Sequence, residues 1–260
     1  MKLIQSDSNP FFRELLKLSG SARQRGKASQ TLLDGAHLLA AYLDSGAVPL
    51  HIIVNSAALR DAEVEALLKR AADVPMTQLD DRLFASLSEL KVPSGILTLI
   101  DIPHSERCVA DSRFALLLED IQDPGNLGSM LRSAAAAGCD AVFLSQNCAD
   151  AWSPKVLRAA MGGHFALHVC EQQNLPEVAR EFGGVLLATT PRAAQSLYDC
   201  DLTGTIAFLI GNEGAGLSDA LLNLATQKIH IPMPGRIESL NAAAATVVCL
   251  FEAVRQRRQK

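Results

Sequence analysis

Residues 113–145 read RFALLLEDIQDPGNLGSMLRSAAAAGCDAVFLS. An apolar run, a polar turn, an alanine-rich segment that ends in glycine and a second apolar run predict a strand, a loop, a helix and a strand. Neither apolar run alternates with polar residues, which is typical of a parallel sheet covered by helices on both faces. This stretch therefore predicts an α/β fold built on a parallel sheet.

The same alternation continues to the C-terminus. We expect further strands at residues 165–169, 184–190, 205–211 and 228–231, and helices at 154–163, 175–182, 217–225 and from Asn241 onward. Residues 1–105 predict a smaller α/β domain, with helices at 10–18, 36–46 and 61–72 and strands at 31–33, 51–54 and 95–100. The polar, proline-containing stretch 101–112 separates the two, so we expect domains at 1–105 and 106–260.

The composition is that of an ordinary globular chain. Of 260 residues, 48% are hydrophobic and 20% charged, which excludes collagenous, low-complexity and wholly disordered classes. The six cysteines form no CxxC pair and no zinc-finger spacing. No signal peptide is visible. The sequence also contains no run of about 18 apolar residues, the length needed to span a membrane. We expect a soluble cytoplasmic protein with reduced thiols and no membrane partner.

Charge is distributed unevenly along the chain. The net charge is -4, but residues 1–27 hold six basic and two acidic residues. A second basic run closes the chain with Arg255, Arg257, Arg258 and Lys260. Such ends either bind a polyanion or merely keep the protein in solution, and charge alone leaves both interpretations open.

Three loops follow predicted strands, at the edge where parallel α/β sheets bind ligands. The first is Asp123-Pro124-Gly125-Asn126, with Arg132 one turn into the next helix. We expect Asn126 to cap that helix. Arg132 near a helix N-terminus opposes the helix dipole, so it is either a plain surface arginine or a group that binds an anion such as phosphate.

The second and third loops are equally unusual. Residues 211–216, GNEGAG, allow close backbone approach to a ligand, and Glu213 is there either a solvated charge or a positioned acceptor. Residues 231–241, IPMPGRIESLN, form a stiff, irregular connection to the last helix. Taken singly, Ser239 and Asn241 are suited to helix capping and Met233 to core packing.

Other chemistries fit less well. The chain has no GxGxxG or Walker motif and no GxSxG elbow, which argues against a nucleotide-dependent oxidoreductase and a serine hydrolase. Glu119, Asp120 and Asp123 suit a turn as well as a magnesium site. His164 and His168 flank a strand-like run rather than a zinc-binding helix. We expect no metal.

Read together, the three loops resemble the motifs of the SpoU (TrmH-like) class of SPOUT RNA methyltransferases. The matching segments are NLGSMLRSAAAAG at 126–138, LIGNEGAGLS at 209–218 and IPMPGRIESLNAAAATVVCLFEA at 231–253. SPKVLRAAMGGHFALHV at 153–169 is also similar to the family, and residues 10–105 more weakly resemble its RNA-binding substrate domain, with Asp34 where a glutamate is usual.

The resemblance implies a homodimer whose catalytic domain has a deep trefoil knot that holds S-adenosylmethionine. The cofactor would lie against Leu209, Gly211, Ile231, Met233, Ser239 and Leu240, and Asn126, Arg132, Glu213 and Asn241 would form the reaction site. We assign RNA contacts to Arg23, Arg25, Lys27, Lys155 and Arg158. The implied reaction is methylation of a ribose 2'-hydroxyl, which we expect in ribosomal RNA; transfer RNA, or a non-catalytic RNA-binding or ribosome-assembly role, are the alternatives.

The family's usual base at the Arg132 position is chemically doubtful, because a guanidinium does not lose its proton in ordinary sites. We therefore expect Arg132 to bind the phosphate beside the target ribose and to orient its hydroxyl. A phosphate oxygen or Glu213 would then accept the proton.

Overall fold

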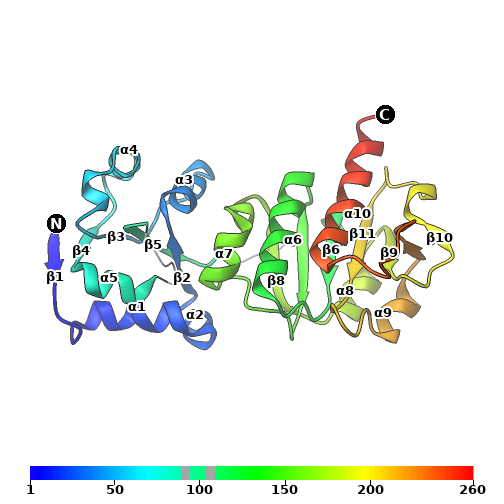
Figure 1. Cartoon of the computed structure of the whole chain (residues 1–260), viewed down its shortest axis with the longest axis horizontal. Helices are drawn as coiled ribbons and strands as arrows, with labels where there is room; N and C mark the ends of the chain where they lie inside the picture. Colours follow the sequence, from blue (N-terminus) through cyan, green and yellow to red (C-terminus); the bar gives the residue numbers. More distant parts are fainter. Residues whose placement is uncertain (89–93, 104–108, 260) are drawn as a thin grey trace. The chain divides into compact units, whose positions relative to one another are not determined.

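The computed structural model describes residues 1–88, 94–103 and 109–259 (Figure 1). Contacts divide the chain into two compact units. Unit 1 comprises Met1–His104 with Trp152–Phe165, and unit 2 comprises Ser105–Ala151 with Ala166–Lys260. The expected boundary between residues 105 and 106 lies outside the described residues.

Segment 152–165 differs from the prediction, which placed it with the second domain. It belongs to unit 1 because its helix α7, Pro154–Ala160, contacts strand β2, Gln30–Asp34. The hydroxyl of Thr31 donates to the carbonyl of Trp152 at 2.7 Å, and Tyr42 meets the edge of Phe165. The polypeptide therefore passes between the two units three times.

Unit 1 is built on a mixed five-stranded sheet. Its other strands are β1 Lys2–Ile4, β3 His51–Val54, β4 Met76–Leu79 and β5 Ile96–Asp101, in the order β1-β4-β3-β5-β2. Strands β1, β4 and β3 are parallel, whereas β5 is antiparallel to both of its neighbours. The helices are α1 Pro10–Gly20, α2 Ala22–Ala28, α3 Ala36–Asp44, α4 Ala62–Arg70 and α5 Asp81–Leu87, with short 3-10 turns η1 Ala58–Arg60 and η3 Gly163–Ala166.

The two faces of this sheet have separate cores. Helices α1 and α5 cover one face, where Phe12 and Phe84 pack with Ile53. Helices α3 and α4 cover the other, where Leu39 and Val64 join the core. Alternate side chains of β3 point to opposite faces, so this one strand contributes to both cores.

Unit 2 carries the parallel sheet that the sequence predicts. Seven strands run in the order β10-β12-β9-β11-β6-β7-β8, and every pairing is parallel. They are β6 Phe114–Leu118, β7 Ala141–Ser145, β8 His168–Gln173, β9 Val185–Thr189, β10 Gln195–Ser196, β11 Ile206–Ile210 and β12 Gln227–His230. The helices are α6 Pro124–Ala137, α8 Leu175–Glu181, α9 Asp219–Leu224 and α10 Ala242–Arg257, with 3-10 turns η2 Val109–Asp111 and η4 Leu197–Asp199.

Helices cover both faces of the sheet in unit 2. Residues Ala115, Leu117 and Leu209 pack with α8 and α9 on one side. Helices α6 and α10 contact each other and lie side by side in Figure 1. Because β6, β11, β9 and β12 are parallel neighbours, the loops that leave them lie along one edge of the sheet.

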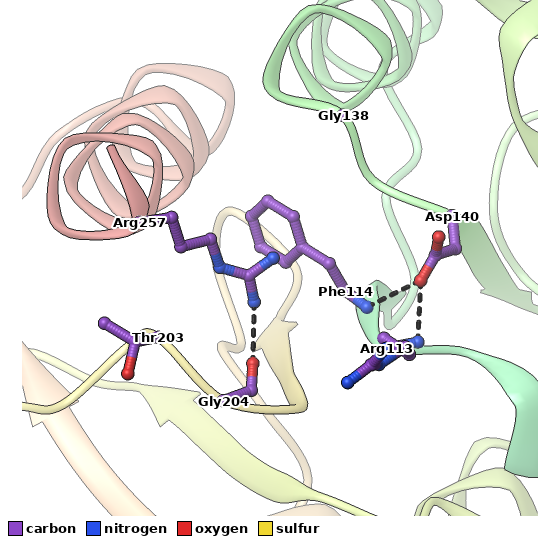
Figure 2. Close-up of a pocket in the computed structure, with 7 residues that line it drawn as sticks. All are labelled: Arg113, Phe114, Gly138, Asp140, Thr203, Gly204 and Arg257. Carbon is purple, nitrogen blue, oxygen red and sulfur yellow. Dashed lines mark hydrogen bonds between the residues drawn. The ribbon is translucent and has the colours of Figure 1, made fainter. Parts of the chain in front are cut away.

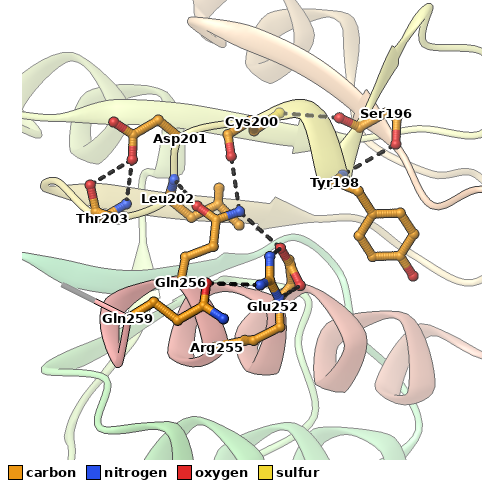
Figure 3. A network of polar contacts seen from close by, with 10 residues as sticks. All are labelled: Ser196, Tyr198, Cys200, Asp201, Leu202, Thr203, Glu252, Arg255, Gln256 and Gln259. Carbon is orange, nitrogen blue, oxygen red and sulfur yellow. Dashed lines mark hydrogen bonds and ion pairs between the residues drawn. The ribbon is translucent and has the colours of Figure 1, made fainter.

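The C-terminal half of α10 is tied to residues 200–204 by polar contacts, and Figure 3 shows those to Cys200 and Leu202. The buried carboxylate of Glu252 accepts from Arg255 Nε at 2.8 Å and Nη2 at 2.7 Å, and these bonds lower the pKa of Glu252. Gln256 Nε2 donates to the carbonyl of Cys200, while Gln256 Oε1 accepts from the amide of Leu202. These bonds fix α10 against the end of the sheet opposite the ligand-binding edge.

Candidate active site

Three side chains from the three predicted loops form one hydrogen-bonded chain. Asn241 Nδ2 donates to Asn126 Oδ1 at 3.0 Å, and Asn126 Nδ2 donates to Glu213 Oε1 at 2.8 Å. These residues come from the end of the 231–241 loop, the first turn of α6 and the loop after β11. The prediction that the loops meet at one place is therefore confirmed for these three residues.

The orientation of both asparagine amides follows from the cap of α10. Asn241 is the N-cap of this helix, and its Oδ1 accepts from the backbone N–H groups of Ala243 and Ala244 at 2.9 and 3.3 Å. With Oδ1 so committed, only the Nδ2 group of Asn241 can face Asn126. Asn126 must then present its oxygen to Asn241 and its Nδ2 group to Glu213. The N-cap of α10 thereby sets the direction of both hydrogen bonds, from Asn241 to Asn126 and from Asn126 to Glu213.

The expected cap of α6 was wrong by three residues. Asp123 is the N-cap and accepts from the amide of Asn126 at 2.8 Å, with Pro124 at the first helical position. Proline is favoured at that position because its ring fixes a helical φ and it has no N–H group to leave unpaired. Asn126 therefore lies inside the first turn, and its side chain is available for Glu213.

The loop after β11 is closed by its own backbone. A Cβ atom on Gly211 would lie 2.2 Å from the carbonyl carbon of Gly216 and 2.3 Å from the nitrogen of Leu217. Asn212 Oδ1 accepts from the amides of Gly214 and Ala215, and its Nδ2 donates to the carbonyl of Asp120 at 2.8 Å. This tight turn holds Glu213 toward Asn126.

Arg132 lies apart from the hydrogen-bonded chain. It is exposed, and its guanidinium has no hydrogen bond or ion pair within the described ranges. Six residues after Asn126, it is about 9 Å further along α6 and about 120° round the helix. A free guanidinium at that position is available to an anion that approaches from solvent.

The residues predicted to hold the cofactor lie at one edge of the sheet. Gly211 and Ile231 follow β11 and β12, which are separated only by β9. Leu209 is fully buried, and its carbonyl accepts from Thr189 Oγ1. Residues 231–240 form no hydrogen bond with any other described residue.

That last property suits a nucleoside-binding loop, because its backbone N–H and C=O groups are available to a ligand. Met233, Ser239 and Leu240 lie in this loop, and Leu240 and Ile237 expose large apolar side chains. The residues present therefore fit a small molecule with a polar base edge and an apolar face, as S-adenosylmethionine has.

Comparison with known proteins identifies the chain. The profile of the SpoU rRNA Methylase family matches residues 113–251. The chain belongs to the SpoU rRNA methylase family. The family resemblance is thus confirmed, and with it the enzyme class, an S-adenosylmethionine-dependent RNA methyltransferase.

Relatives of the SpoU family match along nearly the whole chain. A 23S rRNA (guanosine(2553)-2'-O)-methyltransferase of Bacillus subtilis is 32% identical, covering 96% of this chain and 98% of the relative. The SpoU methyltransferase AviRb of Streptomyces viridochromogenes, solved in complex with AdoMet, superposes with a TM-score of 0.85 at 28% identity, covering 97% of this chain and all of that one. A structure described as an RNA 2'-O ribose methyltransferase gives a TM-score of 0.82 at 30% identity, covering 98% and 99%.

Not all five basic residues assigned to RNA in this SpoU chain are available. Arg23, Lys27 and Lys155 are exposed. Arg25 is only 5% exposed, and its Nη1 donates to the carbonyls of Leu18 and Ser19 at the end of α1, so the assignment of Arg25 is corrected to a structural role.

Arg158 is mostly buried and pairs with the buried carboxylate of Asp34 at 3.8 Å. It joins α7 to β2, both in unit 1. Its position in the sequence therefore did not reveal the role of Arg158, because that role depends on the buried carboxylate of Asp34.

The basic run at the C-terminus is also largely engaged within unit 2. Figure 2 shows Arg257 stacked over Phe114, 4.1 Å from the ring centre, and its Nη2 donates to the carbonyl of Gly204. Burial lowers the pKa of Arg257 from its ordinary value. A cavity of about 280 Å³ lies here, and Asp140 lines it while accepting from the amides of Arg113 and Phe114. This cavity is at the opposite edge of the sheet from Glu213.

Metal and thiol chemistry find no support in the described part of the chain. No group of three metal-ligating side chains occurs there, and both carboxylate oxygens of Asp120 are bound by Ser145 and Asn147. Burial raises the pKa of the Cys139 thiol, and that of Cys249 to about 12, so neither is a thiolate nucleophile at neutral pH. Within the same ranges, no helix is both long and apolar enough to cross a bilayer.

The sequence interpretation missed one positioning residue. Asn212 shapes the turn that carries Glu213, but the prediction treated residues 211–216 as a glycine-rich loop and singled out only its glycines and Glu213. An asparagine two residues after an apolar strand and two residues before Gly214 was a usable signal, because asparagine side chains bond to backbone amides two residues on.

Proposed function

We propose that the protein transfers the methyl group of S-adenosylmethionine to a ribose 2'-hydroxyl in ribosomal RNA. The observation that supports this best is the contact between Asn126 and Glu213, braced by Asn241, which joins all three family motifs in one site. The relative from Bacillus subtilis is named for this reaction on a guanosine of 23S rRNA. Family membership and near full-length similarity favour ribosomal RNA over transfer RNA as the substrate.

S-adenosylmethionine, when bound, supplies a methyl group made electrophilic by its positively charged sulfur. The backbone around Gly211, Ile231 and Leu240 would hold it, with Leu209, Met233 and Ser239 adjoining. The free hydrogen-bonding groups of residues 231–240 support this placement.

The chain's own residues would then prepare the hydroxyl. Methyl transfer needs an oxygen nucleophile held in line and a group that takes its proton. One oxygen of Glu213 is bound by Asn126, and its other oxygen has no partner among the described residues. That free oxygen is placed to accept the proton from the 2'-hydroxyl, either directly or from a neighbouring phosphate.

Arg132 would bind the phosphate beside the target ribose. Its planar guanidinium can make two parallel hydrogen bonds to phosphate oxygens, which fixes the position of the ribose as well as neutralising charge. The absence of any bond to Arg132 within the described ranges favours such an external partner.

The finer architecture is also proposed. Strand β12 lies beyond β9, yet the chain returns from it to cap α10 beside Asn126, and α10 lies on α6 and β11. This crossing of the last segment supports a trefoil knot.

Val247 and Phe251 expose apolar side chains one turn apart on α10, with Leu240 just before the helix. Such an exposed apolar stripe favours a homodimer formed through α10.

We propose that unit 1 is the RNA-recognition domain and that the enzyme works in the cytoplasm. Exposed Arg23 and Lys27 lie together on the seven-residue helix α2, and Lys155 lies on α7 of the same unit. They can contact phosphates without reading sequence.

The test is methyl transfer from labelled S-adenosylmethionine to total RNA from a strain that lacks the protein, followed by nucleoside mass spectrometry. We expect a 2'-O-methylnucleoside that disappears with Arg132→Ala while cofactor binding, measured by calorimetry, persists. Cofactor binding without any methylation of naked RNA or of ribosomal subunits would contradict the proposal and favour a non-catalytic RNA-binding role.

A further inference from the structure

A cavity of about 370 Å³ is lined in part by the turn that carries Glu213. Its walls come from the end of β6, through Glu119 and Gln122, and from the turn itself, through Asn212 and Ser218. Asn212 is the residue before Glu213, and Gln122 is four residues before Asn126. Residues that line the cavity therefore lie close in sequence to two of the three reaction-site residues, Glu213 and Asn126.

Two polar side chains in this cavity have unused hydrogen-bonding capacity. Glu119 Oε2 accepts from the amide of Ser218 at 2.7 Å, but Glu119 Oε1 has no partner among the described residues. The amide of Gln122 likewise makes no hydrogen bond there. Ser218 holds the Glu119 carboxylate in a fixed orientation, so the site is organised before any ligand binds.

A cation is not the natural occupant. The neighbouring carboxylate of Asp120 has both oxygens bound, by Ser145 and Asn147, and its backbone carbonyl is bound by Asn212. That leaves one unoccupied carboxylate oxygen, which is far fewer than the six to eight oxygen ligands of calcium or the octahedron of magnesium. The two groups available to a ligand are instead the carboxylate oxygen of Glu119 and the side-chain amide of Gln122.

The proposed reaction brings a nucleobase to this place. The base is attached to the ribose carbon adjacent to the one that carries the 2'-hydroxyl, so a ribose positioned at Glu213 must place its base beside the same turn. Enzymes that act on single nucleotides read an unstacked base through hydrogen bonds to its Watson–Crick edge.

We propose that this cavity receives the base of the target nucleotide and that Glu119 makes it selective for guanine; this rests on the proposed 2'-O-methylation. Guanine alone presents two adjacent donors, N1–H and the N2 amino group. The unoccupied Oε1 of Glu119 can accept from one of them, and the second lone pair of Oε2, beside the bond from Ser218, can accept from the other. Its O6 acceptor lies next to them, within the range of a side-chain amide such as that of Gln122. Adenine, cytosine and uracil each place an acceptor where the carboxylate needs a donor, so they are repelled.

The first test is the identity of the methylated nucleoside. After methyl transfer to total RNA from the deletion strain, we expect 2'-O-methylguanosine. Methylation of only adenosine, cytidine or uridine would overturn the guanine assignment and leave the proposed reaction intact. No methylation by the wild-type enzyme would overturn the proposed reaction and the assignment with it.

The second test separates base reading from a structural role of Glu119. Once the site is mapped, a short RNA with inosine at the target lacks only the N2 amino group. We expect wild-type kcat/KM to fall roughly 5- to 150-fold with this RNA, as for loss of one bidentate base contact. Glu119→Gln should lower kcat/KM for the guanosine RNA by a similar factor and remove the difference between the two RNAs.

Cofactor affinity should stay unchanged in Glu119→Gln, and Asp219→Asn, an exposed acid just after Ser218, is the matched control that keeps full discrimination. If Glu119 only anchored α9 through Ser218, Glu119→Gln would lower Tm and slow both RNAs equally. A persistent inosine penalty in Glu119→Gln would overturn the assignment.

Discussion

Asn126 donates a hydrogen bond of 2.8 Å to Glu213, which lies 87 residues away in the chain. Asn126 is itself oriented by Asn241, and Asn241 by the first amides of α10. The position of the Glu213 carboxylate therefore depends on a helix that begins after it in sequence. Each bond fixes one amide, so no member of the chain can rotate without breaking a neighbour's bond.

Asn241→Asp should separate helix capping from site geometry. Aspartate caps helices as well as asparagine does, so we expect Tm to remain close to that of the wild type. The variant lacks the Nδ2 donor and places a second oxygen against Asn126 Oδ1, so methyl transfer should fall roughly 100-fold through misorientation. Asn241→Ala should lose about 1 kcal/mol of stability in addition. Full activity in Asn241→Asp, measured with labelled cofactor, would show that the hydrogen bond from Asn241 to Asn126 is not needed for methyl transfer.

Gly211→Ala should disrupt the turn that holds Glu213. The new Cβ would overlap the backbone of Gly216 and Leu217, and forcing backbone apart costs roughly 1–3 kcal/mol. Gly214→Ala is the control within the same turn, because its Cβ would meet only Asn212 Oδ1 at 3.5 Å. We expect loss of activity and a lower Tm in the first variant and near-normal values in the second. Equal behaviour of the two would refute the packing argument.

Arg132→Lys should be inactive but stable. The side chain is exposed and unbonded within the described ranges, so thermal unfolding should be unchanged. Lysine keeps the charge but lacks the planar fork that matches phosphate, and loss of such a preorganised contact costs roughly 100- to 1,000-fold in rate. Measured kcat/KM near the wild-type value would sink the phosphate-binding role.

Glu252→Gln should reveal a pH-dependent anchor of α10. Hydrogen bonding by Arg255 lowers the pKa of Glu252 in the folded protein, so the stabilisation is present above the ordinary glutamate pKa and is lost as the pH falls through the lowered value. The variant should melt below the wild type at pH 7, and the two Tm values should converge at strongly acidic pH. A Tm difference that is constant between pH 7 and pH 3 would contradict this assignment.

Removal of residues 1–105 should impair folding as well as RNA recognition. Trp152, Val156 and Leu157 are buried in unit 1, and this deletion would expose them while leaving the segment in place. We expect the truncated chain to bind a hydrophobic dye and to aggregate at concentrations where the full chain does not. Replacing the three residues by polar ones in the truncated chain should restore solubility and cofactor binding, but not RNA methylation. A well-behaved truncated chain without these changes would show that the segment does not need unit 1.

Most of the fold could be predicted because most of its elements are strongly patterned. The strands at β3 and β7 match the predicted bounds, and the parallel sheet follows from continuous apolar runs. The prediction missed β1, β4, β10, α5 and α2. Strand β4 is as long as β3, but its sequence MTQL is not a continuous apolar run, and the sequence of α2, ARQRGKA, has no apolar face. Such elements form because a neighbouring element supplies their partners.

The sequence predicted that the three loops meet, but it did not predict how their side chains are arranged. Local rules favoured Asn126 as a cap, whereas Asp123 before Pro124 occupies that position. The burial of Arg25 and the pairing of Arg158 with Asp34 depend on tertiary contacts, which residue type and spacing do not encode. The Asn212 bond to Asp120 spans 92 residues and could not be inferred from either loop alone.

The three passages of the chain between its units bear on how such a protein can diversify. A recognition domain attached by a single linker can be exchanged in one recombination event. Here residues 152–165 belong to unit 1 and α7 contacts β2, so a newly acquired domain would have to accept this helix as well. Substrate range should therefore change by gradual drift of residues on the existing unit, in step with those on α7, rather than by domain shuffling.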